Sequence, residues 1–65
     1  MKSADIITIA KIVATIITVL NLNNLQANKL KTYVNDNMHS WIAYRKNENE
    51  IETIIKNKAK EIRDE

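Results

Sequence analysis

Apolar residues recur along the chain at alternating steps of three and four residues, from Ile6 to Ile62. We call this path the apolar seam; it comprises Ile6, Ile9, Val13, Ile16, Leu20, Ala27, Leu30, Val34, Trp41, Tyr44, Ile51, Ile55 and Ile62. Four polar residues interrupt it: Asn23, Asn37, Glu48 and Lys58. This spacing keeps one face of an α-helix directed at a partner helix. The pattern predicts an all-α, oligomeric chain of two or three helices, or one nearly continuous long helix.

Asparagine-rich clusters at 21–28 and 35–37 are candidate breaks, because these side chains compete with helical backbone hydrogen bonds. Asn47 with Glu50 three residues later is typical of a helix N-cap, and Ser3 is a start signal for the first helix. We expect helices over about 4–21, 24–46 and 49–63. They fall within an apolar segment 1–22, an aromatic-bearing amphipathic segment 23–46 and a charged amphipathic segment 47–65. Without breaks they would form a rod of roughly 95 Å.

Composition supports a helical chain and narrows its chemistry. The 65 residues include no glycine, proline or cysteine. Sheet proteins use glycine and proline repeatedly in turns, and cysteine is needed for disulfides and thiolate metal sites. A chain this short needs partner chains, a membrane or unusually good helix packing to complete its core.

The segment 1–22 is the most apolar, with a single lysine and three threonines between residues 6 and 20. Its Ile, Val and Leu residues contribute roughly −5 kcal/mol to membrane insertion, and the central Lys11 costs about 3 kcal/mol, so the helix is a marginal transmembrane span. A helix that is apolar over most of its circumference must be buried on nearly all sides. We therefore expect lipid or other copies of the chain to cover it. Lys29, Lys31, Arg45 and Lys46 outweigh Lys2, which predicts a membrane location with the C-terminal part in the cytoplasm.

The polar residues of this segment form one narrow stripe: Thr8, Lys11, Thr15 and Thr18. In a membrane such a stripe faces neighbouring helices or a wet lumen, whereas in a helical bundle it is the solvated face of a core helix. Both interpretations remain open at this stage.

All three aromatic residues, Tyr33, Trp41 and Tyr44, lie in the second segment. They fit either an amphipathic helix resting at a bilayer interface or ordinary packing against another helix. In the third segment Ile51, Ile55 and Ile62 lie on one apolar stripe of a charged helix, and we expect this stripe to mediate self-association. The net charge of +2 is spread along the chain, so nucleic acid is not an expected partner.

No arrangement of residues predicts catalysis, a cofactor or a metal site. Asp36, His39 and Ser40 are neighbours on one expected helix and cannot converge on a substrate carbonyl. Asp36 and His39 alone supply too few ligands for a metal. The chain is therefore expected not to be an enzyme.

Two functional hypotheses follow. The first is a small membrane-inserting protein that self-associates; its layout, a short apolar helix followed by a charged amphipathic helix, resembles that of small single-span phage holins, a resemblance that implies pore formation in a phage or bacterial membrane. The alternative is a soluble structural or interaction subunit of a helical bundle, filament or virion. The expected partners are a second copy of the chain, membrane lipid or another protein.

Overall fold

The computed structural model describes residues 4–65 and contains three α-helices, with no strand in that range. They are α1 (Ile6–Val19), α2 (Asn24–Ala43) and α3 (Glu48–Arg63). The predicted all-helical class is therefore confirmed. The alternative of a continuous rod is not what the described residues form, because they fold back into a body of 32 × 20 × 17 Å.

Each helix begins at a side chain that accepts a backbone hydrogen bond. Asp5 accepts from the Thr8 N–H at 2.8 Å, and Asn47 accepts from the Glu50 N–H at 2.9 Å, as predicted. Asn23 forms a full capping box with Gln26, in which each side chain accepts from the other residue's backbone N–H at 2.9 Å. These caps satisfy backbone donors that the first helical turn leaves unpaired. The predicted start signal at Ser3 lies outside the described residues.

The two interhelical turns have the same construction. After α1, the Leu22 N–H donates to the Ile17 carbonyl at 3.1 Å, with Asn21 in the left-handed region at φ 53°. After α2, the Lys46 N–H donates to the Trp41 carbonyl at 3.0 Å, with Arg45 at φ 54°. This is the Schellman arrangement, which ends a helix and turns the chain.

The cluster at 35–37 does not interrupt α2. Asn37 is half-buried, and its side-chain amide donates to the Tyr33 carbonyl at 2.8 Å, inside the helix. The competing side chain therefore bonds within the helix instead of terminating it. The helix ends at Ala43, three residues before the expected boundary at 46.

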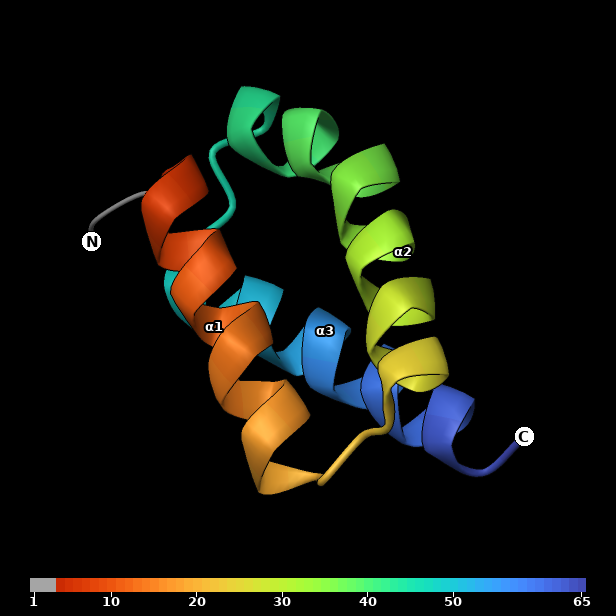
Figure 1. Cartoon of the computed structure of the whole chain (residues 1–65). Helices are drawn as coiled ribbons and strands as arrows, with labels where there is room; N and C mark the ends of the chain where they lie inside the picture. Colours follow the sequence, from red (N-terminus) through yellow and green to blue (C-terminus); the bar gives the residue numbers. More distant parts are fainter. Residues whose placement is uncertain (1–3) are drawn as a thin grey trace.

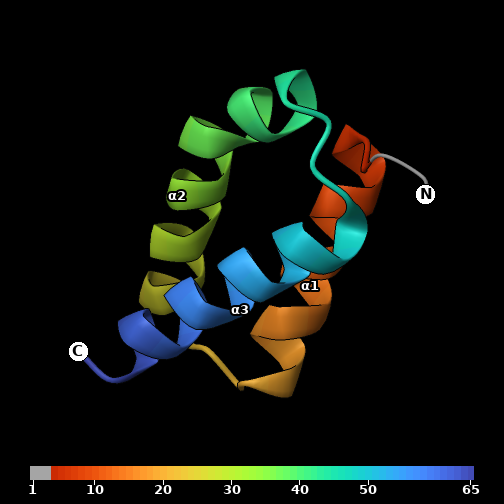
Figure 2. The same cartoon turned by 180° about the vertical axis from the view of Figure 1, so that it is seen from behind.

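In the packed chain, α1 and α2 lie at an angle to each other and α3 crosses behind both (Figure 1). Seen from the other side, α3 lies in front and covers that face of the α1–α2 pair (Figure 2). The seam supplies most of the core: Ile9, Val13, Ile16, Ala27, Leu30, Val34, Trp41, Ile51, Ile55 and Ile62 are buried, joined by Ala4, Leu22 and Ala59. Because the chain folds back at the two Schellman turns, around Asn21 and Arg45, the seam packs on itself.

The predicted membrane location is wrong. No helix within residues 4–65 is long and apolar enough to cross a membrane. The physical reason is length: α1 has 14 residues and rises about 21 Å, whereas the hydrocarbon core of a bilayer is about 30 Å thick. The Schellman turn at Asn21 ends the helix before further residues can extend it.

Candidate functional site

An apolar groove runs between α1 and α2 on the face that α3 leaves uncovered. It has a volume of about 540 Å³. We call it the α1–α2 groove; its lining residues are Ile6, Ile9, Ala10, Val13, Ala14, Ile17 and Thr18 from α1 and Lys31, Val34, Asn35 and Met38 from α2. A groove between two helices whose other face is packed against a third is the place where a fourth helix would sit in a bundle.

Helix α1 gives the groove its apolar wall. Val13 and Ile9 lie at its floor, 7% and 1% exposed, whereas Ile6 is 57% exposed. Ala10 and Ala14 are exposed lining residues one helical turn apart. Because alanine fills so little space, another helix could approach the α1 backbone closely there.

Two more large apolar side chains of α1 remain uncovered. Ile7 is 67% exposed and Val19 is 70% exposed. Ile7 lies two turns before Ala14, so helical periodicity puts it beside the edge of the groove. Val19 does not line the groove and is a single exposed apolar residue of the ordinary kind, whereas an apolar side chain that adjoins an apolar groove, as Ile7 does, is typical of an interaction surface.

Helix α2 gives the groove its polar edge. Lys31 and Asn35 are exposed lining residues spaced four apart, so they follow one another along the same face of α2. Below them Val34 is buried and Met38 is half-buried, both packed in or against the core. The groove therefore has one apolar wall and one wall with a cationic and an amide side chain at its rim.

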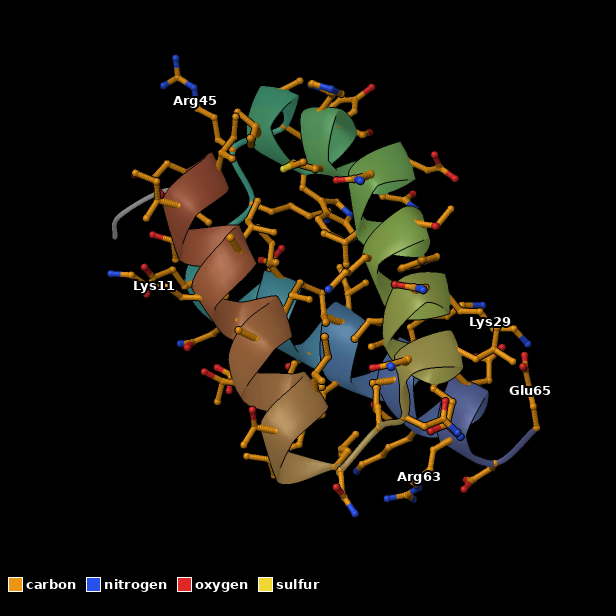
Figure 3. All side chains as sticks on the ribbon, in the orientation of Figure 1. Lys11, Lys29, Arg45, Arg63 and Glu65 are labelled. Atoms are coloured by element: carbon orange, nitrogen blue, oxygen red, sulfur yellow. The ribbon has the colours of Figure 1, made fainter. Side chains whose placement is uncertain are left out.

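The predicted polar stripe lies mostly on the outer surface of α1. Lys11 and Thr15 are exposed and Thr8 is half-buried. Figure 3 shows Lys11 pointing away from α2. Thr18 alone of the four lines the groove, and its hydroxyl donates to the Ala14 carbonyl at 3.0 Å. In this chain the stripe is thus largely exposed, and it brings no group of polar side chains together.

The three predicted interface aromatics occupy three different environments. Trp41 is buried in the core at 5% exposure, and Tyr44 at the end of α2 is 81% exposed. Tyr33 is half-buried, with its ring centroid 6.2 Å from that of Trp41 and 5.1 Å from the Lys58 Nζ. Tyr33 and Trp41 thus help to join α2 to α3 and the core, and they do not form an outward-facing belt with Tyr44.

The residues predicted to mediate self-association are buried within the chain. Ile51 and Ile55 are 0% exposed and Ile62 is 3% exposed, in the core cluster shared with α1 and α2. The apolar stripe of α3 therefore finds its partner helices in its own chain, and it is not an exposed surface.

Some of the charged side chains within residues 4–65 form ion pairs at the surface. The closest joins Lys29 Nζ to Glu65 Oε1 at 2.8 Å, and both side chains are about half exposed. The hydrogen bond from Lys29, with its positive charge, lowers the pKa of the Glu65 carboxyl below its ordinary value. Figure 3 shows the two side chains directed toward each other from α2 and the C-terminus. Neither Lys29 nor Glu65 lines the groove.

The described residues hold no cluster of three or more metal-ligating side chains. His39 is exposed on α2 and does not line the groove. Sequence patterns did not predict the groove, because it depends on the angle between two helices. The one signal in the sequence was that apolar residues cover nearly the whole circumference of α1.

No protein-family model, curated protein or solved structure matches the chain.

Proposed function

We propose that the chain is a non-enzymatic interaction subunit of a helical assembly, and that the α1–α2 groove is the surface by which it binds a helix from another polypeptide. One observation carries this proposal: the apolar groove is lined by residues of α1 and α2 and by none of α3, which lies behind these two helices (Figure 1). An amphipathic helix that lays its apolar face into a groove is a common mode of recognition.

The amount of apolar surface left on α1 supports this proposal. Within α1 the chain buries the seam residues Ile9, Val13 and Ile16 and leaves Ile6 and Ile7 more than half exposed. Covering Ile6 with another apolar surface would remove much of that side chain from water, at about 25 cal/mol per Å². A docked helix would therefore gain the hydrophobic free energy of burying apolar surface that the three helices leave in contact with water.

The character of the lining favours a helix over a small polar ligand. Seven of the lining residues come from one helical face of α1, and they extend from Ile6 to Thr18, a rise of about 18 Å. The polar side chains among the lining residues are Thr18, Lys31 and Asn35. An elongated apolar trough with a thin polar edge matches the shape and chemistry of an amphipathic helix.

The test is binding of a 14-residue helical peptide with a leucine stripe and glutamine at its other positions. Its affinity is measured by fluorescence anisotropy of a label on the peptide. Ala14→Glu puts a longer, charged side chain where the docked helix would pack, and it should weaken binding at least tenfold, because that side chain would block the close approach of the helix and would lose its water on docking. Thr15→Glu is the matched control, since Thr15 is exposed on the same helix and does not line the groove.

Ala14 is exposed in the free chain, so Ala14→Glu should leave the fold intact, which circular dichroism verifies. Loss of binding with Ala14→Glu and retention with Thr15→Glu would support the proposal. Equal binding by both variants, or no binding by the unmodified chain, would overturn it.

A further inference from the structure

The α1–α2 groove has an uneven charge distribution. Lys31 is the one charged residue among its lining residues within 4–65, and it lies on the α2 side. Asn35 follows it one turn later on the same edge, and no carboxylate lines the groove. Among the lining residues of α1, Thr18 is the only one with a polar side chain, and its hydroxyl already donates to the Ala14 carbonyl.

A helix seated in this groove would have its two edges in different surroundings. The edge along α1 would meet Ala10, Ala14 and Ile17, and the edge along α2 would meet Lys31 and Asn35. A carboxylate on the α2 edge would be attracted by the Lys31 ammonium and could accept from the Asn35 amide. A lysine in that place would be repelled, and such repulsion is a common source of specificity.

We infer that the occupant of the groove is an amphipathic helix of another protein, with an apolar stripe and carboxylates along the edge that faces Lys31. This inference rests on the proposed function and adds the chemistry of the partner. The lining of α1 from Ile6 to Thr18 gives the docked part of that helix a length of three to four turns, about 18 Å.

Residues 4–65 do not present such a helix on their own surface. Its one helix with carboxylates beside an apolar stripe is α3, and the stripe residues Ile51, Ile55 and Ile62 are buried in the core. The open side of α1 bears no carboxylate along Ile6–Val19. The segment Ile6–Val19 of a second copy would therefore bring an apolar face to the groove without an acid for Lys31.

The test uses three helical peptides with one leucine stripe and either glutamate, glutamine or lysine at the flanking positions. Anisotropy at low ionic strength should show that the glutamate peptide binds about three to ten times more tightly than the lysine peptide. Lys31→Glu should reverse this order. The matched control is Lys11→Glu, which makes the same charge change on the outer surface of α1, where Lys11 points away from α2 (Figure 3). In this variant the glutamate peptide should still bind more tightly than the lysine peptide.

Each failure has a distinct meaning. Two results would leave the groove function standing and show that the acidic-partner inference is wrong. In the first, Ala14→Glu weakens binding of the glutamine peptide, but the glutamate and lysine peptides bind equally. In the second, Lys11→Glu reverses the order of the charged peptides as well as Lys31→Glu does. If no peptide depends on Ala14, the proposed function itself is wrong. If the unmodified chain dimerises by sedimentation at micromolar concentration and Ala14→Glu abolishes the dimer, the occupant is a second copy and the inference is overturned.

Discussion

Asn21 and Arg45 occupy the same position in two separate turns: each is the first residue after a helix C-cap, and each has a positive φ, 53° and 54°. Glycine usually fills this position because a side chain there costs roughly 1 kcal/mol or more. The chain contains no glycine. Asparagine tolerates the left-handed region better than most residues, whereas arginine has no such advantage. The second turn therefore carries more strain than the first.

Replacing Arg45 with glycine should relieve this strain. We expect Arg45→Gly to raise the free energy of unfolding by about 0.5–1 kcal/mol, measured by urea denaturation followed by circular dichroism. Arg45→Ala is the control, because it removes the long side chain and keeps the Cβ; its stability should stay near that of the unmodified chain. A glycine variant no more stable than the alanine variant would contradict this account of the turn.

The apolar stripe of α3 packs against helices of its own chain. Substitutions at two adjacent isoleucines can test this. Ile55 is 0% exposed and Ile54 is half-buried. Ile55→Ala should lower the free energy of unfolding by about 2–5 kcal/mol, and Ile54→Ala by clearly less. The loss should not depend on protein concentration. A concentration-dependent loss for Ile55→Ala would show that this residue packs between chains.

The Lys29–Glu65 pair makes a prediction about pH. Lys29 lowers the pKa of Glu65 below its ordinary value of 4.5 in the folded chain, so the pair stabilises the fold above that value. The contribution is lost as pH falls through the lowered pKa, because the carboxyl then gains a proton. A carbon-detected NMR titration should show the Glu65 pKa rising toward 4.5 in Lys29→Gln and staying unchanged in Lys31→Gln. An unchanged Glu65 pKa in Lys29→Gln would exclude the ion pair.

The helices and much of the core follow from sequence patterns. The alternating steps of three and four residues identified Ile9, Leu30 and Ile51, which are all at most 1% exposed. Asn47 was recognisable as a cap because its side chain and Glu50 have the spacing that a first helical turn requires. These are local properties, which depend only on residues a few positions apart.

The fold-back and the groove depend on relationships between distant residues. A continuous seam fits either an intermolecular rod or a chain packed on itself, and the choice is made at Asn21 and Arg45, where the left-handed backbone reverses direction. Arginine is a poor signal for such a turn. The groove is equally non-local, because Lys31 and Ala14 come together only through the angle between α1 and α2.

The central claim is that a helix docks between α1 and α2, and intermolecular NOEs test it most directly. The protein is labelled with ¹³C at alanine, isoleucine and methionine methyl groups and mixed with the unlabelled glutamate-flanked peptide. We predict NOEs from the peptide leucines to Ala10, Ala14 and Ile17 on α1 and to Met38 on α2, with none to Ile54 on α3. NOEs to Ile54, or an absence of NOEs from both walls of the groove, would contradict the account.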